Sequence, residues 1–108
     1  MEHKLVVVLI SASTLPEAER LAEALLAARL TACASILPGV SSSYWWHGNI
    51  ESAHEAFLLV KSRTVLLDEI TKCVMAHHSY EVPEIIALPI VGGNADYLEW
   101  VADETKQR

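Results

Sequence analysis

The hydrophobic pattern of the chain changes period from one segment to the next, and these changes predict strands and helices in alternation. Residues 5–10 are continuously apolar, which is typical of a central strand covered on both faces. Residues 18–28 instead carry apolar side chains at helical spacing, which predicts a helix that ends near Arg29. We expect Thr14 to cap this helix, with Glu17 completing a capping box.

The second half of the chain repeats this alternation. Apolar spacing from Leu66 onward predicts another helix, which Thr64 caps and which ends at about His78. Residues 85–88 predict a further strand that ends near Pro89. Asn94 then caps a short helix that carries three apolar positions, Tyr97, Leu98 and Val101.

The segment from Ala32 to Ser62 predicts one long β-hairpin. Gly48-Asn49 is a two-residue turn signal, because glycine accepts a positive φ and asparagine tolerates one better than most residues. A turn at that point places Tyr44 opposite Ala53, Trp45 opposite Ser52 and Trp46 opposite Glu51. Pro38-Gly39 interrupts the first arm, which predicts a kink or a bulge there.

The length of this hairpin predicts a partner for its tip. The arm from Ile50 to Lys61 has no proline or glycine, and at about 3.3 Å per residue it reaches roughly 40 Å. A compact chain of this size has a radius of gyration of about 13 Å, and so a diameter of about 35 Å. The tip therefore overhangs, and we expect Tyr44, Trp45 and Trp46 to form an interface in a homotrimer. The alternative is a bent hairpin that folds back on its own sheet.

Taken in order, the elements form the βαββαβ pattern of an α+β, ferredoxin-like fold, followed by a short C-terminal helix. We expect a single domain over residues 1–108, with both long helices on one face of the sheet. The other face then lies open. Sheets of this kind often meet another copy of themselves, which favours a homo-oligomer.

The composition excludes several classes of binding partner. A net charge of −6 with no basic cluster argues against nucleic acid and against anionic membrane surfaces. The longest apolar run, residues 5–10, is too short to span a bilayer, and the first residues lack the layout of a signal peptide. Two cysteines, Cys33 and Cys73, do not make a disulfide framework. We therefore expect a cytoplasmic protein with reduced thiols, in which Cys33 is a small core residue.

Three segments resemble the signatures of a known family. Residues 32–40, followed by residues 43–46 and Gly48, are similar to the hairpin of the CutA proteins, the divalent-cation tolerance family. Residues 78–85 and 94–100 resemble the second and third signatures of that family. The resemblance implies a ferredoxin-like homotrimer similar to PII signalling proteins, with a cytoplasmic role linked to divalent metals, copper above all.

The chain departs from the family pattern at two positions. Some bacterial members carry a proposed copper-ligating cysteine at the end of the first strand, where this chain has Ile10, which cannot ligate. The second signature usually has proline after its histidine. Here that place holds Ser79, so the turn is less rigidly set.

His77 and His78 are the best candidates for metal ligands, because neutral imidazole suits copper, zinc and nickel. Adjacent helical residues point about 100° apart, so the pair shares one ion only where the helix frays at its end. The alternative is a polar pair at a helix C-terminus, where a protonated histidine favours the dipole. Cys73, four residues before His77, is a possible additional ligand, although a packed cysteine is the commoner outcome.

No arrangement of catalytic residues emerges, so we do not expect an enzyme; residues 41–43 are serines without a nucleophile elbow. Glu81 and Glu84 flank a proline turn, and they either line a cleft between subunits or are solvated loop carboxylates. The sequence thus predicts a trimer that binds divalent metal weakly and contributes to metal tolerance. Two alternatives stay open: a PII-like sensor for an unidentified small-molecule effector, and a structural module that binds a partner.

Overall fold

Strand β1 (Leu5–Ala12) runs through the interior of a four-stranded antiparallel sheet whose order is β2-β3-β1-β4. The computed structural model describes residues 4–107. β1 pairs with β3 (Asn49–Arg63) on one side and with β4 (Ile85–Pro89) on the other. The predicted central strand and the ferredoxin-like strand order are therefore confirmed.

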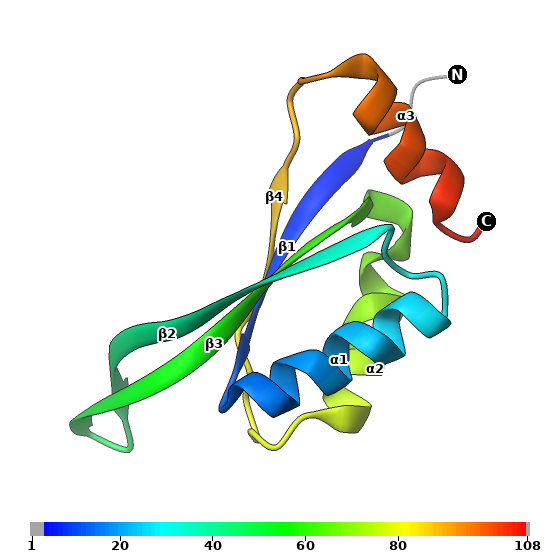
Figure 1. Cartoon of the computed structure of the whole chain (residues 1–108). Helices are drawn as coiled ribbons and strands as arrows, with labels where there is room; N and C mark the ends of the chain where they lie inside the picture. Colours follow the sequence, from blue (N-terminus) through cyan, green and yellow to red (C-terminus); the bar gives the residue numbers. More distant parts are fainter. Residues whose placement is uncertain (1–3, 108) are drawn as a thin grey trace.

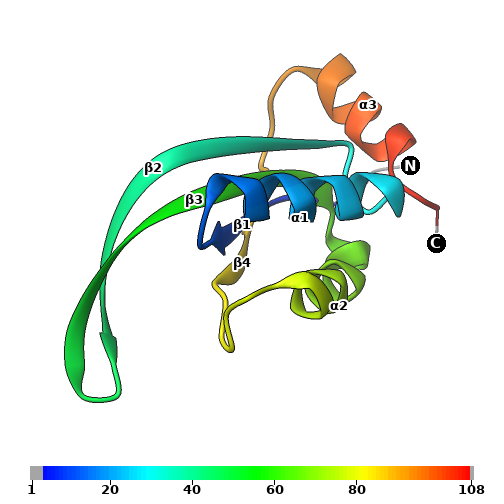
Figure 2. The same cartoon turned by 60° about the horizontal axis from the view of Figure 1, so that its bottom comes forward.

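Two helices, α1 (Leu15–Ala27) and α2 (Leu67–His77), cover the same face of this sheet (Figures 1 and 2). Their apolar stripes meet the inward side chains of the strands in one core, whose fully buried members include Leu21, Leu25, Ile70 and Val74 from the helices and Val8, Ile10, Leu58 and Val60 from the strands. The period of 3.6 in the helices and of 2 in the strands brings these positions together. None of the described helices is long and apolar enough to cross a membrane.

The start of α1 follows the prediction only in part. The Thr14 hydroxyl accepts a hydrogen bond from the Glu17 backbone N–H at 3.2 Å, so the predicted cap is confirmed. The Glu17 carboxylate does not complete a capping box with Thr14. It accepts hydrogen bonds from the backbone N–H groups of Ser13 and Ser79, both at 2.8 Å, and so joins the helix to a distant loop.

The predicted Thr64 cap is wrong. A 3-10 turn (Thr64–Leu66) precedes α2, and no side chain caps either element. The Thr64 hydroxyl instead donates to the Lys4 carbonyl oxygen at 3.2 Å, next to β1. At the C-terminal end, α3 (Ala95–Glu104) begins as expected, with the Asn94 side chain accepting from the Asp96 N–H.

The hairpin of β2 (Cys33–Trp46) and β3 turns one residue earlier than the sequence predicts. Trp46 pairs with Asn49, so the two turn residues are His47 and Gly48. The corrected register also places Trp45 opposite Ile50 and Tyr44 opposite Glu51. His47 has φ 48° and Gly48 has φ 80°. A type I′ turn requires a positive φ at both positions, and histidine enters that region more readily than most residues.

The predicted interruption at Pro38-Gly39 is a β-bulge. These two residues together oppose Ala56 alone, since Leu37 pairs with Phe57 and Val40 with Glu55. Gly39 has a φ of 69°, a conformation that costs glycine little. Beyond the bulge the ribbon curves and leaves the body of the molecule, whose longest dimension is 48 Å (Figure 2).

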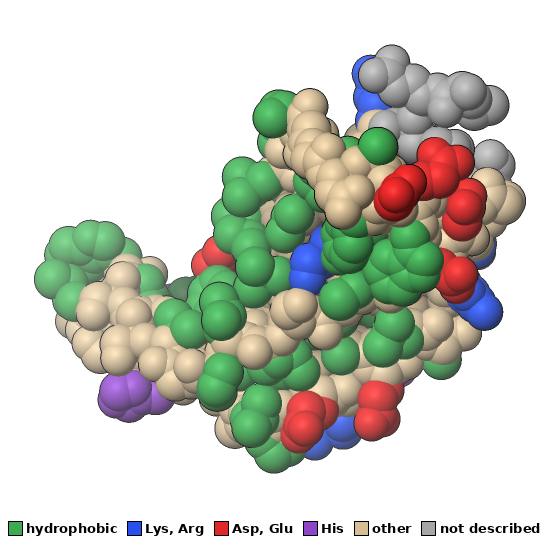
Figure 3. Space-filling view, turned by 45° about the horizontal axis from the view of Figure 1, so that its top comes forward, with side chains coloured by type: hydrophobic (Ala, Val, Ile, Leu, Met, Phe, Trp, Pro, Cys, Tyr) green, Lys and Arg blue, Asp and Glu red, His purple; other side chains and the backbone are tan. Residues whose placement is uncertain are grey.

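Hydrophobic side chains remain uncovered on the hairpin and on the sheet face opposite α1 and α2 (Figure 3). The C-terminal helix α3 covers only one end of that face, where Val101 and Ala102 pack against Leu5. Trp45 is 71% exposed and its cross-strand neighbour Ile50 is 66% exposed. Leu37, Ile86 and Leu88 are also exposed. The overhang is thus confirmed.

Candidate functional site

A cleft of about 830 Å³ opens between the hairpin, the end of β1 and residues 78–84, which we call the 78–84 loop. Its lining consists of Ser11, Ser42, Ser43, Tyr44, Trp46, Glu51, Glu55, Ser79, Tyr80, Glu81, Val82 and Glu84. Glu81 and Glu84, expected at a cleft between subunits or in solvent, lie at this cleft within a single chain. Tyr44 and Trp46 lie here as well, because alternate residues of a strand share a face, and this leaves Trp45 on the opposite face.

The charge of the lining has one sign. Four carboxylates come from β3 and the 78–84 loop, and the lining contains no lysine, arginine or histidine. Serine residues, three aromatic residues (Tyr44, Trp46 and Tyr80) and Val82 make up the rest of the lining. A concave surface of this composition focuses a negative potential and favours cationic ligands over anionic ones.

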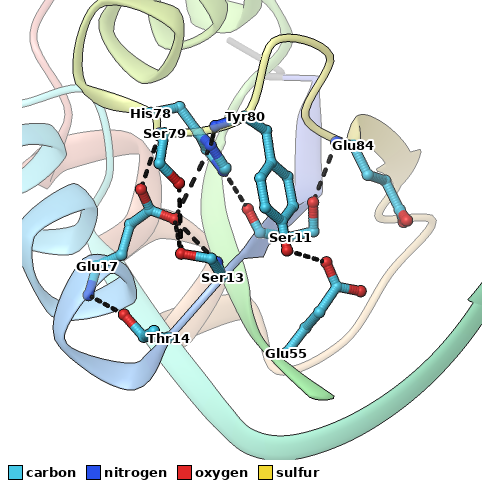
Figure 4. Close-up of polar contacts among 9 residues, drawn as sticks. All are labelled: Ser11, Ser13, Thr14, Glu17, Glu55, His78, Ser79, Tyr80 and Glu84. Carbon is cyan, nitrogen blue, oxygen red and sulfur yellow. Dashed lines mark hydrogen bonds and ion pairs between the residues drawn. The ribbon is translucent and has the colours of Figure 1, made fainter. Parts of the chain in front are cut away.

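Tyr80 and Glu55 form the best-defined polar contact of the cleft (Figure 4). The Tyr80 hydroxyl donates to Glu55 Oε2 at 2.7 Å, and Glu55 is only 8% exposed. Burial raises the pKa of the Tyr80 phenol, and the hydrogen bond to Glu55 raises it further. The phenol therefore stays protonated at neutral pH and keeps donating to the carboxylate.

Glu17 anchors the 78–84 loop to the start of α1 (Figure 4). Besides the two backbone N–H groups, its carboxylate accepts from the Ser13 hydroxyl at 2.8 Å. Burial acts to raise the pKa of Glu17, but the hydrogen bonds from Ser13 and Ser79 outweigh it and lower that pKa from 4.5 to about 2. The carboxylate is thus charged over the whole range in which proteins usually fold.

The structure separates the two histidines that the sequence paired as metal ligands. The His78 side chain is fully buried, its Nε2 donates to the Ser11 carbonyl oxygen at 2.6 Å, and its Nδ1 accepts from the Tyr80 N–H at 2.9 Å. Both ring nitrogens are engaged, so His78 has no lone pair to offer a metal in this conformation. Its geometry is that of a residue that positions the loop.

His77 points outward at the last residue of α2. Its Nδ1–H donates a hydrogen bond to the Cys73 carbonyl oxygen at 2.8 Å. The Nε2 lone pair therefore stays available to coordinate a metal ion, and His77 is exposed. The Cys73 thiol is half-buried and packs against the core, and burial raises its pKa, which disfavours the ligating thiolate. Over residues 4–107, no three His, Cys, Asp or Glu side chains lie close enough to hold a metal ion together.

The structure also shows the surroundings of three other positions that the sequence analysis discussed, Ile10, Ser79 and Cys33. Ile10 is fully buried in the core, and its side chain faces the helices. Ser79 supplies the N–H that Glu17 binds, a donor that a proline would lack. Cys33 was expected in the core, and this is wrong. It is half-buried at the start of β2, on the sheet face away from the helices, with Lys61 Nζ 3.8 Å from its sulfur.

Comparison with known proteins gives concordant results. A family model described as CutA1 divalent ion tolerance protein matches residues 6–104. A rice protein, the chloroplastic CutA 1 of Oryza sativa subsp. japonica, is 43% identical over 102 residues, which make up 94% of this chain and 58% of the rice protein. The chain thus spans little more than half the length of that relative. The divalent-cation tolerance protein CutA of Thermus thermophilus is 43% identical over 99 residues, or 92% of this chain and 96% of that protein.

Solved structures agree with this result. The crystal structure of CutA1 from Oryza sativa matches with a TM-score of 0.95 at 42% identity, over 98% of this chain and 97% of that one. A CutA structure from Archaeoglobus fulgidus, described as a periplasmic divalent cation tolerance protein, matches with a TM-score of 0.90 at 39% identity, over 97% and 100% of the two chains.

Proposed function

The chain belongs to the CutA1 divalent ion tolerance family, and from that membership we propose that it contributes to divalent-cation tolerance by binding divalent ions weakly, copper(II) before the others, as a homotrimer. The proposed role is one of binding, not of catalysis. We further propose a cytoplasmic location, which the two free cysteines, Cys33 and Cys73, support.

His77 carries the metal-binding proposal. Its Nδ1–H is held by a backbone carbonyl, an arrangement that fixes the tautomer and the ring orientation of metal-binding histidines. The described residues fit a metal only as a single nitrogen donor, with water completing the coordination sphere. Weak binding in the Irving–Williams order is the consequence, which places copper(II) ahead of zinc.

Calorimetric titration of copper(II) and zinc tests this proposal. We expect His77→Ala to abolish copper binding, and His78→Ala to leave it in place while lowering the melting temperature, because His78 holds the 78–84 loop. His54→Ala is the matched control, since His54 is also an exposed histidine but lies on β3. Copper binding should weaken in acid, because protons compete with the metal for a histidine nitrogen. Unchanged affinity in His77→Ala would contradict the assignment.

The homotrimer proposal is supported by complementary apolar surfaces at opposite ends of the molecule. Trp45 and Ile50 protrude from the hairpin. Tyr97 and Trp100 lie next to each other on α3, at the far end, with a centroid distance of 5.6 Å and rings tilted by 36°, and both are exposed (Figure 1). A head-to-tail contact between two different patches closes into a ring when the rotation permits, and three copies make such a ring.

A second candidate function is a sensor whose cleft takes a small molecule. The cleft favours it directly, because its volume of about 830 Å³ lies within the usual range of ligand pockets. In this function, metal binding at His77 is incidental. A thermal-shift screen of metals against small organic molecules separates the two, since a ligand stabilises in proportion to its concentration over its dissociation constant.

A further inference from the structure

We propose that the cleft binds a small organic amine in its ammonium form, with the charged group against the Glu55 carboxylate and the hydrocarbon part against the Trp46 ring. This inference rests on the second candidate function, a sensor whose cleft takes a small molecule, and it names the chemical class of that molecule. It is independent of metal binding at His77, which lies outside the cleft lining.

Glu55 is the first reason for this assignment. Glu55 is only 8% exposed and lines the cleft, and the Tyr80 hydroxyl donates to its Oε2. No described residue donates a hydrogen bond to Oε1, which Figure 4 shows directed away from the Tyr80 hydroxyl. No described side-chain oxygen is both buried and without a partner, so Oε1 is open to the cleft, where a ligand can reach it. A donor with a positive charge forms a stronger hydrogen bond to a carboxylate than a neutral donor does.

The rest of the lining determines the sign of the charge that a ligand must carry. Glu51, Glu81 and Glu84 add negative charge around Glu55, and no cationic residue of the lining offsets them. A phosphate or a nucleotide would meet these carboxylates without a compensating lysine or arginine. The cleft therefore selects against the anionic effectors that a phosphate-binding sensor takes.

Two observations favour an organic cation over a bare metal ion. First, the carboxylates do not converge: among residues 4–107 no group of three possible ligands could hold an ion. Second, Tyr44 and Trp46 line the same cleft, and aromatic faces attract ammonium groups and cover alkyl chains. The hydroxyl of Ser42, on the same strand face as Tyr44 and Trp46, supplies an acceptor that orients the remaining N–H groups.

Calorimetry and thermal shift with 1,4-diaminobutane test the proposal on the full chain, with 1,4-butanediol as the neutral analogue of the same length. We expect saturable binding of the diamine, none of the diol, and a loss of at least tenfold in affinity in Glu55→Gln. Glu23→Gln, at an exposed position of α1 outside the cleft, should bind as the parent does. Trp46→Leu should weaken binding of the diamine several-fold by removing the aromatic face.

The possible outcomes distinguish failure of the amine assignment from failure of the sensor function. Equal binding of diamine and diol, or full affinity in a folded Glu55→Gln variant, would overturn the ammonium assignment. Binding of ATP but not of the diamine would overturn it as well, and would leave the sensor function standing. If the diamine does not bind, the inference fails; if no compound of the thermal-shift screen binds either, the sensor function fails with it. Circular dichroism of the unliganded variants verifies that each is folded.

Discussion

Glu17 is the residue on which the geometry of the 78–84 loop most depends. A helix-capping role was expected of it, and the structure adds a second role, because its carboxylate also binds the backbone of Ser79, 62 residues away. The serine that replaces the family's usual proline is what makes this contact possible, since proline has no N–H to donate. Ser79, where the chain departs from the family pattern, thus provides the donor of a hydrogen bond whose acceptor is Glu17.

Acid unfolding measures that interaction. The pKa of Glu17 lies below its ordinary value, so its contribution to stability is present above pH 4.5 and is lost as pH falls from 4.5 toward about 2. The shift from 4.5 to about 2 corresponds to roughly 3 kcal/mol. We expect Glu17→Gln to lower the free energy of unfolding at pH 7 by a large part of that amount and to flatten its pH dependence between pH 4.5 and 2. Urea denaturation at several pH values measures both.

Glu19→Gln is the control for this prediction, because Glu19 lies on the same helix and is exposed. Its unfolding free energy should match that of the parent at every pH. A Glu17→Gln variant that retains the full pH dependence of the parent would show that other carboxylates are responsible for it.

The candidate site also shows where residue-level reasoning from sequence stops. The i to i+4 spacing correctly placed His77 near Cys73, but the contact goes to the backbone carbonyl and not to the thiol. No local pattern indicates that Tyr80 meets Glu55, since the loop packs against a strand 25 residues earlier in the chain. Contacts of this kind depend on tertiary packing, which the period of a segment does not encode.

At the scale of elements, the α-helices and strands found over residues 4–107 were predicted from hydrophobic period and turn signals, whereas the 3-10 turn (Thr64–Leu66) and the exact positions of some turns and caps were not. The hairpin turn shows why. Gly48-Asn49 and His47-Gly48 both contain the glycine, and the structure uses the second pair, with Gly48 as the second turn residue. A shift of one residue changes every cross-strand pair, which is why Trp45 faces Ile50 and not Ser52.

Substitutions at His47 test this turn. Because His47 has φ 48°, His47→Asn should leave the melting temperature unchanged or raise it, since Asn-Gly is the preferred pair in type I′ turns. His47→Val should lower the free energy of unfolding by about 1 kcal/mol, because a β-branched residue is strained at positive φ. Ser43→Val, at an exposed strand position in the same arm, is the control and should be neutral or stabilising. If His47→Val were as stable as the parent, His47 would belong to the strand.

At the scale of the whole molecule, one hairpin serves both the cleft and the proposed contact with a second copy, because a strand has two faces. Tyr44 and Trp46 point to the cleft of their own chain, while Trp45, on the other face, is left for a neighbour. The sequence predicted all three rings as one interface. The alternation of strand faces divides them between a ligand and a second copy, and the bulge at Pro38-Gly39 bends the ribbon between its two faces.

The proposed trimer is tested by multi-angle light scattering at micromolar concentration. We expect the parent to have three times the mass of the chain, and Trp45→Ala to dissociate, because truncating a central aromatic anchor typically costs 2 kcal/mol or more. Trp100→Ala, at the other end of the molecule, should have the same effect, since a head-to-tail ring needs both patches. Met75→Ala, which removes an exposed hydrophobic side chain from α2, should remain trimeric. A parent that is monomeric, or a trimer indifferent to Trp45→Ala, would show that the overhanging hairpin serves another partner.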